Sequence, residues 1–195
     1  MTDLSRTLLL PIDVQRGFDD ESWPPRWNVE MEANGRALLA RWREAGAPII
    51  HVRHDSVQPG STLAPGHWGN DFRDGFVPHA GEPAVSKSVN SAFIGTDLDL
   101  RLRRLGIERI VTFGISTDMC VSTTIRTGAN MGWAFTLVAD ACDCFALPDS
   151  RGGTIPAEMI HDAHVATLAA EFCDVTTTAE IVASLAVRPV ALAST

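Results

Sequence analysis

Cys120 is the residue of this sequence whose type and position most readily suggest chemistry. It lies in the stretch FGISTDMCVSTTIRTG, which runs from Phe113 to Gly128. A strand-like run at residues 109–112 precedes this stretch, and apolar residues at helical spacing follow the cysteine. The thiol is therefore predicted where a strand passes into a helix. The free N–H groups and partial positive charge of a helix N-terminus favour a thiolate, so we expect a lowered pKa for Cys120.

A lone cysteine is often only a small buried apolar residue, so the interpretation depends on its neighbours. Asp13 follows the apolar run RTLLLPI, and Lys87 ends the short run AVSK. An ammonium near a thiol also favours the thiolate, and a carboxylate can accept the proton of the thiol. Free N–H groups in the turn before Cys120 can stabilise an oxyanion. Together these groups suit acyl transfer through a thioester.

These side chains meet only if the segments that carry them form one sheet. Strand-like and helix-like segments alternate along the chain. We expect strands over residues 6–12, 47–53, 84–87, 108–115, 134–140 and 173–177. We expect helices over 29–45, 96–106, 154–172 and 178–185, and one that has Cys120 at its start and ends near Gly132. Such alternation is typical of a parallel α/β sheet with right-handed crossovers. Ligands of these sheets bind beyond the carboxyl ends of the strands, and that rule gathers Asp13, Lys87 and Cys120 at one edge.

Composition limits the class of protein. A chain of 195 residues predicts one domain, covering residues 1–195, and 45% hydrophobic residues suffice for a sizeable core. The net charge of −8 argues against nucleic acid and anionic membranes as partners. The N-terminal stretch lacks the features of a signal peptide, no apolar run has transmembrane length, and the four cysteines are few. We therefore expect a reduced, cytoplasmic protein.

Several segments resemble the isochorismatase-like cysteine hydrolases, a family that includes nicotinamidase, N-carbamoylsarcosine amidase and ureidoacrylate amidohydrolase. The segment LLLPIDVQRGF resembles the family's first strand, with its Asp-x-Gln. The block from VSKSVNSAF to GISTDMCVSTTIRTGANMGW resembles the family's lysine-to-cysteine region, and FTLVADACDCF and HDAHVATLAAEFCDV resemble its later strand and helix. The likeness covers nearly the whole chain.

The resemblance implies a fold and a set of roles. The fold is a three-layer α-β-α, Rossmann-like arrangement around a six-stranded parallel sheet. Cys120 is the nucleophile, Asp13 the proton shuttle and Lys87 a polarising cation. A cis peptide between Ile115 and Ser116 aims the N–H groups of Ser116 and Cys120 at one oxyanion position. The family also implies a homodimer or homotetramer.

The sequence departs from the metal-binding members of the family. Nicotinamidases bind a metal through an Asp-x-His and a further histidine after the second strand, but here His54 and Ser56 take the first places and Thr62 the third. We therefore expect no metal and no cofactor. His51, His54 and Asp55 remain a metal-competent set, although His51 and His54 should point to opposite faces of a strand.

Two further histidines and two cysteines have a structural explanation. His161 and His164 have the spacing of a metal pair on a helix, but a solvated or interface face explains them better. Cys142 and Cys144 lack the Cys-x-x-Cys redox spacing and are interpreted as structural thiols.

Five residues are candidates for substrate binding. Trp23, Trp27 and Phe72 lie in Gly/Pro-rich segments without periodicity, where aromatic side chains can line a pocket. Gln15 and Phe18 follow the first strand at the same edge. The long segment at about 55–83 should shape the pocket.

The resulting prediction is a cysteine-dependent hydrolase of a small amide, ureide or carbamoyl compound. One alternative is an isochorismatase-type or isonitrile-type hydrolase or lyase. Another is a non-catalytic, redox-sensing thiol protein, which would need neither Asp13 nor Lys87. The small-molecule substrate itself is not specified by the sequence.

Overall fold

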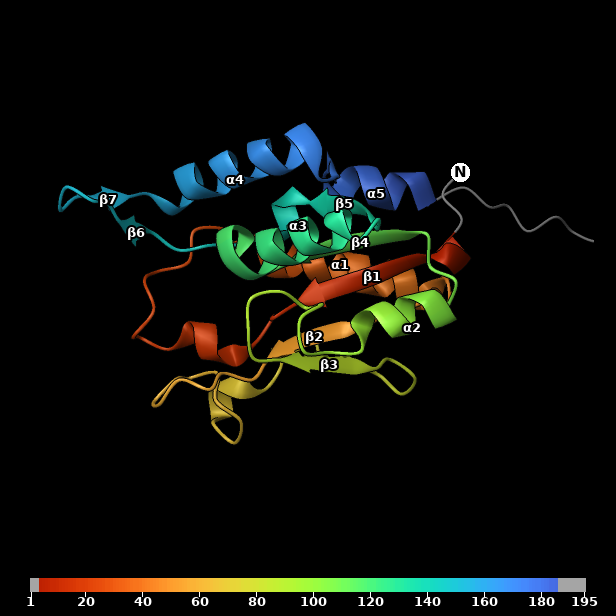
Figure 1. Cartoon of the computed structure of the whole chain (residues 1–195), viewed down its shortest axis with the longest axis horizontal. Coiled ribbons are helices and arrows are strands. Elements are labelled where there is room, and N and C mark those ends of the chain that lie inside the picture. Colours follow the sequence, from red (N-terminus) through yellow and green to blue (C-terminus); the bar gives the residue numbers. More distant parts are fainter. Residues whose placement is uncertain (1–3, 186–195) are drawn as a thin grey trace, which may run out of the picture.

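The protein is built around a six-stranded sheet in which every neighbouring pair of strands is parallel (Figure 1). The computed structural model describes residues 4–185. The strand order is β3-β2-β1-β4-β5-β8. The strands are β1 Thr7–Ile12, β2 His51–His54, β3 Ala84–Lys87, β4 Arg109–Gly114, β5 Ala134–Val138 and β8 Asp174–Thr176. The predicted six-stranded parallel sheet is confirmed.

Helices cover both faces of this sheet. The helices are α1 Met31–Glu44, α2 Leu98–Arg104, α3 Ser122–Asn130, α4 Ala157–Glu171 and α5 Thr178–Leu185. Helices α1 and α5 pack against each other, and so do α3 and α4. In Figure 1, α2 and α3 lie in front of the sheet and α1 lies behind it. Among residues 4–185, no helix combines the length and the apolar character that a membrane span needs.

Strand β1 is the centre of the core. It pairs with β2 on one side and β4 on the other, and all six of its residues are buried. A strand covered on both faces has to be apolar throughout, which explains the run TLLLPI. Fully burying each leucine of this strand stabilises the fold by roughly 1.5–3 kcal/mol. The central strand therefore provides a rigid base for the residues that follow it.

Three local features differ from the sequence-based expectation. Strand β2 begins only at His51, because Ile49 makes an isolated bridge to Leu9 rather than a continuous ladder. The helix that carries Cys120 opens with a π-helical turn, Thr117–Val121, before α3 begins. A two-stranded hairpin, β6 Leu147–Pro148 with β7 Thr154–Ile155, was not predicted, since two-residue strands show no periodicity.

The long segment at residues 55–83 has no regular element except a short 3-10 turn, Trp68–Asn70. This turn packs tightly against the loop after β1: a Cβ atom on Gly69 would lie 2.5 Å from the Cα of Gly17. The loop after β1, this segment and the β6–β7 hairpin all lie at the carboxyl edge of the sheet, at the left of Figure 1. The segments without periodicity therefore surround the edge that carries the predicted chemistry.

Candidate active site

The structure brings Asp13, Lys87 and Cys120 into direct contact. Asp13 follows β1, Lys87 ends β3, and Cys120 lies in the π-helical turn after β4. The Lys87 ammonium Nζ donates to Asp13 Oδ2 at 2.6 Å and to Cys120 Sγ at 3.2 Å. All three residues are buried, with exposed fractions of 0%, 2% and 8%. The predicted gathering at the carboxyl edge is therefore present as a hydrogen-bonded cluster.

The backbone at Asp13 is unusual. Its φ is 53°, in the left-handed region that aspartate tolerates better than most residues. The Asp13 N–H donates to the carbonyl of Val52 at 2.9 Å, which fixes the residue beside the end of β2. This turn ends β1, and the carboxylate reaches Lys87 across β2.

Lys87 is a permanent cation in this site. Burial alone would lower its pKa, but attraction to the Asp13 carboxylate and the hydrogen bonds to Asp13 and to Cys120 Sγ outweigh burial, and the pKa is raised. Its ammonium has three hydrogens, and the third acceptor is Nδ1 of His54 at 3.0 Å. Each N–H of Lys87 therefore has its own acceptor.

The expected lowering of the Cys120 pKa is wrong for the resting site. Burial raises the pKa of this thiol, the Asp13 carboxylate raises it further, and Lys87 only partly opposes them. The sequence-based expectation includes the two groups that lower the pKa, the helix start and Lys87. It leaves out the two that raise it, the loss of water on burial and the Asp13 carboxylate. The raised pKa favours the protonated thiol in the resting site, and Sγ donates to Asn90 Oδ1 at 3.7 Å.

His54 belongs to this cluster, although the sequence suggested it only as a doubtful metal ligand. Its ring accepts from Lys87, and two buried amides hold its backbone: Gln15 Oε1 accepts the His54 N–H at 2.8 Å, and Gln15 Nε2 and Asn70 Nδ2 each donate to the His54 carbonyl at 3.0 Å. Gln15 Nε2 also donates to the Asn70 carbonyl at 2.9 Å. With its amide engaged by backbone groups, Gln15 positions His54, and these contacts do not favour the expected substrate contact.

The turn before Cys120 has the expected geometry. The Ile115–Ser116 peptide is cis, as the resemblance implies. Gly114 is required by close approach, because a Cβ atom there would lie 2.0 Å from the carbonyl oxygen of Ile12. The Ser116 carbonyl accepts from the N–H groups of Met119 and Val121. The oxyanion-hole role of the Ser116 and Cys120 N–H groups stays a prediction.

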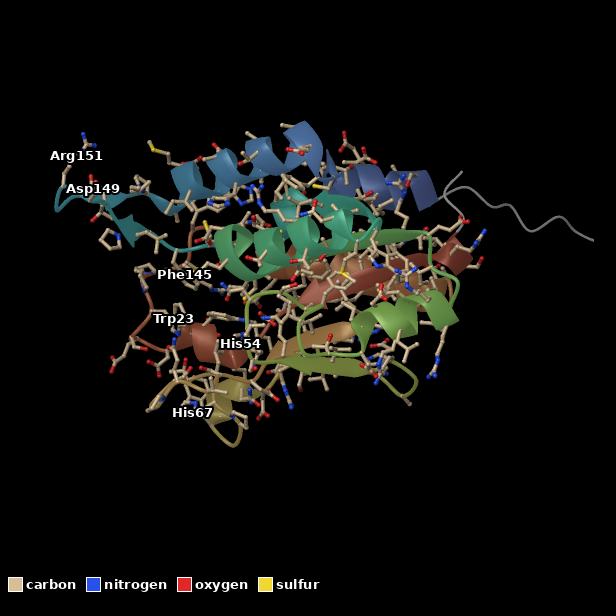
Figure 2. The ribbon with its side chains drawn as sticks, in the orientation of Figure 1. Trp23, His54, His67, Phe145, Asp149 and Arg151 are labelled. Carbon is tan, nitrogen blue, oxygen red and sulfur yellow. The ribbon has the colours of Figure 1, made fainter. Side chains whose placement is uncertain are left out.

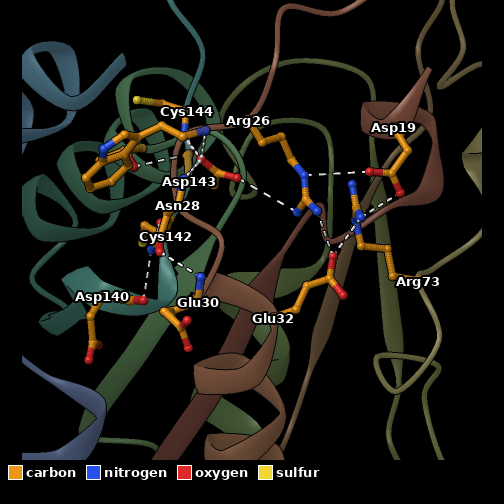
Figure 3. Close-up of polar contacts among 12 residues, drawn as sticks. Asp19, Arg26, Asn28, Glu30, Glu32, Arg73, Asp140, Cys142, Asp143 and Cys144 are labelled. Atoms are coloured by element: carbon orange, nitrogen blue, oxygen red, sulfur yellow. Dashed lines mark hydrogen bonds and ion pairs between the residues drawn. The ribbon is translucent and has the colours of Figure 1, made fainter. Parts of the chain in front are cut away.

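Asp143 joins this turn to the loop after β1 (Figure 3). Its Oδ1 accepts from the backbone N–H groups of Trp27, Asn28 and Cys144 at 2.9–3.2 Å. Its carbonyl accepts from the N–H of Thr117 at 2.9 Å. The same carboxylate is 3.8 Å from Arg26 Nη1. The sequence offered no signal for this residue, since its partners come from three separate segments.

An arginine network extends this connection along the same edge (Figure 3). Arg73 donates to Asp19 at 2.6 Å and to Glu32 at 2.9 Å, and Arg26 donates to Glu32 at 2.9 Å. These residues line a cavity of about 450 Å³. These ion pairs connect the loop after β1, which carries Asp19 and Arg26, to Glu32 at the N-terminus of α1.

The aromatic candidates do not form one group. Phe18 and Trp23 pack together with ring centroids 4.9 Å apart, and Phe145, which the sequence did not single out, joins both. Phe72 packs instead on His51, at 5.7 Å. Figure 2 places Trp23, Phe145 and His54 at the carboxyl edge. Phe18 and Trp23 therefore share one aromatic cluster with Phe145, while Phe72 lies with a histidine outside it, and the substrate-binding role of all three candidates stays a prediction.

Trp27 marks a separate contact with α4. Its ring lies 4.8 Å from that of His161, whose Nδ1 is 2.9 Å from the Thr117 hydroxyl. His161 is only 5% exposed, so the expectation of a solvated or interface position is wrong. The helix presents this side chain inward, toward the turn that carries Cys120.

The residues present do not fit a metal ion. The ligand atoms of Asp13, His54 and Cys120 lie within 4.8 Å of one another, which is close enough for a site. Lys87 Nζ, however, bonds all three of them and takes the place of a cation. His51 does not join them, because its Nε2 pairs with Glu82 at 2.9 Å. The opposite directions predicted for His51 and His54 therefore agree with their contacts.

Asp55, part of the metal-competent set, and Thr62, at the place of the third nicotinamidase ligand, bond to other side chains instead. Asp55 bonds Arg53 and Asn70. The Thr62 hydroxyl accepts from the indole N–H of Trp23 at 3.1 Å.

A larger cavity, of about 840 Å³, lies away from this chemistry. It opens at the amino edge of the sheet and is lined by residues that include Arg43, Ile49, Glu82 and Arg104. None of Asp13, Lys87 and Cys120 lines it. The candidate active site is therefore assigned by side-chain chemistry and not by cavity size.

Comparisons with known proteins agree with the resemblance. A family model described as the isochorismatase domain matches residues 7–180. The isochorismatase family protein YrdC of Bacillus subtilis is 37% identical over 174 residues, which cover 89% of this chain and 93% of that protein. An isochorismatase-family structure from Chromobacterium violaceum superposes with a TM-score of 0.90 at 41% identity, covering 94% of this chain and 95% of the other. Ureidoacrylate amidohydrolase RutB of Serratia proteamaculans is 34% identical over 130 residues, covering 67% of this chain and 48% of that enzyme.

Proposed function

The chain belongs to the isochorismatase family of hydrolases, and we propose that it cleaves the C–N acyl bond of a small amide, ureide or carbamoyl compound through a thioester on Cys120. The observation that carries this proposal is the single ammonium of Lys87 bonded to both the Asp13 carboxylate and the Cys120 thiol. A nucleophile, a proton acceptor and a fixed cation within one buried cluster are the parts that acyl transfer requires.

The reaction begins with a neutral thiol. As Cys120 Sγ attacks the acyl carbon, Asp13 accepts the thiol proton, and the carbonyl becomes a tetrahedral oxyanion. The N–H groups of Ser116 and Cys120 stabilise that charge. Collapse of the intermediate breaks the C–N bond, and Asp13 returns the proton to the leaving nitrogen. Ammonia or an amine departs, and the acyl group remains on sulfur.

Water completes the cycle. Asp13 accepts a proton from water as the water oxygen attacks the thioester carbon. As the C–S bond breaks, Asp13 passes that proton to the sulfur. The products are a carboxylic or carbamic acid and the regenerated thiol, so one water is consumed for each C–N bond. Lys87 keeps its charge throughout and stabilises the sulfur anion each time it forms.

The substrate class follows from the same chemistry and from one relative. Ureidoacrylate amidohydrolase, by its name, cleaves a ureide, which contains a C–N acyl bond of this kind. A buried and neutral thiol also argues against the redox-sensing alternative, since oxidation sensors need an accessible thiolate.

A screen for ammonia release tests the proposal. Small amides, ureides and carbamoyl compounds are incubated with the wild-type protein and with Cys120→Ala. We expect turnover of at least one compound by the wild type and none by Cys120→Ala at equal folded content. If Cys120→Ala keeps a tenth of the wild-type turnover on a true substrate, Cys120 is not the nucleophile.

A further inference from the structure

We propose that His54 is a substrate-binding residue: its Nε2–H donates a hydrogen bond to a second acceptor atom of the substrate, next to the scissile carbonyl. This inference rests on the proposed function and narrows it to acyl compounds that carry such an acceptor, as acylureas do in their second carbonyl.

The tautomer of His54 follows from its contact with Lys87. Nδ1 of His54 lies 3.0 Å from Lys87 Nζ, and an ammonium can only donate. Nδ1 is therefore the acceptor nitrogen of the ring. A neutral imidazole with an unprotonated Nδ1 carries its hydrogen on Nε2, so the ring presents one N–H on the side away from Lys87.

The ring stays neutral in this environment. Burial lowers the pKa of His54, and the Lys87 cation lowers it further, while Asp13 and Asp55 only partly oppose them. Protonation would also place a second positive charge against the ammonium. A neutral donor binds a carbonyl oxygen without attracting free anions into the site.

Hydrogen bonds with two buried side chains fix the backbone of His54. Gln15, fully buried, and Asn70, 5% exposed, bond its backbone through three hydrogen bonds of 2.8–3.0 Å. Two buried amides from separate segments thus fix one residue at the end of β2. A side chain that binds a substrate needs such support, because its ring has to keep one orientation in every molecule.

Access distinguishes His54 from the other three members of the cluster. Asp13, Lys87 and Cys120 are buried, whereas His54 is partly exposed. Figure 2 places His54 at the carboxyl edge. Its Nδ1 is used by the cluster, so the remaining Nε2–H is the donor left for a bound molecule. A substrate that reaches Cys120 Sγ also comes within range of this ring, because the ligand atoms of the two residues lie within 4.8 Å.

Two conservative variants separate the two nitrogens of the ring. The amide of an asparagine reaches about as far as Nδ1, and that of a glutamine about as far as Nε2. We compare His54→Asn and His54→Gln on a matched pair of substrates: a ureide of the form R–CO–NH–CO–NH2, and the simple amide R–CO–NH–CH2–CH3, which lacks the second carbonyl. The exposed His79→Asn is the control variant.

We expect His54→Asn to lower kcat/KM for the ureide by roughly 10- to 100-fold while changing the simple amide little, because a lost hydrogen bond to the substrate has that scale. His54→Gln should recover most of the ureide activity, and His79→Asn should behave as the wild type. The inference is overturned if His54→Asn keeps the wild-type ureide-to-amide ratio. It is also overturned if both His54 variants lose the two substrates equally, since His54 would then only position Lys87.

The tautomer can be tested on the wild-type protein without any substrate. In a spectrum of the protein labelled with ¹⁵N-histidine, His54 should show a protonated Nε2 and an unprotonated Nδ1. A protonated Nδ1 would contradict the proposed donor. If Cys120→Ala is active, the proposed function itself fails. If Cys120→Ala is inactive and the His54 tests are negative, only this inference fails.

Discussion

At the scale of single residues, Asp13 and Lys87 act on Cys120 in opposite directions. Asp13 raises the pKa of the thiol and Lys87 lowers it, and burial decides the balance in favour of the protonated form. A site that stores the proton on sulfur avoids a permanent buried thiolate. In the proposed mechanism, the carboxylate that disfavours the resting thiolate is also the group that removes the thiol proton during attack.

Asp13→Asn should therefore separate thiol acidity from catalysis. Without the carboxylate, Lys87 remains to favour the thiolate, so we expect a lower pKa for Cys120 and faster alkylation at neutral pH. Turnover should nevertheless fall by roughly 10²-fold or more, since no group accepts the proton. The measurements are iodoacetamide alkylation rates against pH and ammonia release. Slower alkylation in Asp13→Asn would contradict the assigned electrostatics.

Lys87→Ala tests whether the residues act as one unit. It leaves the Asp13 carboxylate buried without its cation, so we expect a loss of stability on the order of 3–5 kcal/mol as well as a loss of at least about 10²-fold in turnover. Added to Asp13→Asn, which removes that charge, Lys87→Ala should have a much smaller further effect on both quantities. Urea unfolding and turnover of the single and double variants check this. Losses that simply multiply would argue against a shared site.

At the scale of elements, the contact between β1 and β4 positions the turn that carries Cys120, the proposed nucleophile. Gly114→Ala would place a methyl group 2.0 Å from the Ile12 carbonyl, so the turn before Cys120 has to move. We expect a loss of roughly 10²-fold in turnover, because small misplacements at a reacting centre have that scale. The matched control is Gly46→Ala, which also has a positive φ, of 61°, but meets no atom within 4 Å.

The control should lose only the roughly 1–2 kcal/mol of stability that the left-handed conformation costs and keep its turnover. If Gly114→Ala and Gly46→Ala are equally active, the close approach of Gly114 to the Ile12 carbonyl does not position Cys120.

Glu82 connects the entry of β3 to its neighbours and makes the fold sensitive to acid. It accepts from Arg43 and pairs with His51, and its pKa is lowered to about 2. Burial opposes this shift, but the hydrogen bonds with Arg43, the His79 N–H and His51 outweigh it. A carboxyl group with a lowered pKa stabilises the fold above its unfolded value, and this contribution is lost as the pH falls toward 2.

Glu82→Gln should therefore lower the free energy of unfolding by about 1–2 kcal/mol at pH 7, after allowance for solvent screening, and by much less near pH 2. Urea unfolding of the variant and the wild type at several pH values gives this difference. A difference that does not change with pH would show that the charge of Glu82 is not responsible.

At the scale of the whole molecule, the sheet and the three catalytic candidates could be predicted from the sequence. Buried parallel strands require apolar runs, and strand ends in such a sheet converge, so Asp13, Lys87 and Cys120 were found by position alone. His54 was not found as a partner of Lys87, because that contact depends on the pairing of β2 with β3. Phe145 was missed because loops without periodicity do not reveal which side chains meet.

The position of Lys87 predicts that activity does not depend on a bound metal. Prolonged dialysis against EDTA and 1,10-phenanthroline should leave kcat/KM unchanged. Addition of zinc, iron or manganese should not increase it. A loss of activity that one of these metals restores would contradict the assignment of Lys87 as the cation of the site.

Because Lys87 is part of the chain, the site obtains its positive charge without binding a metal ion. A metal ion is acquired after synthesis, exchanges with the surrounding pool and can be replaced by a wrong ion. Lys87 is delivered by translation, in a one-to-one ratio with the chain, and can neither dissociate on dilution nor be exchanged. Folding alone therefore completes the charge balance of this site, and the fraction of active enzyme should equal the fraction of folded chain at any protein concentration at which the fold persists.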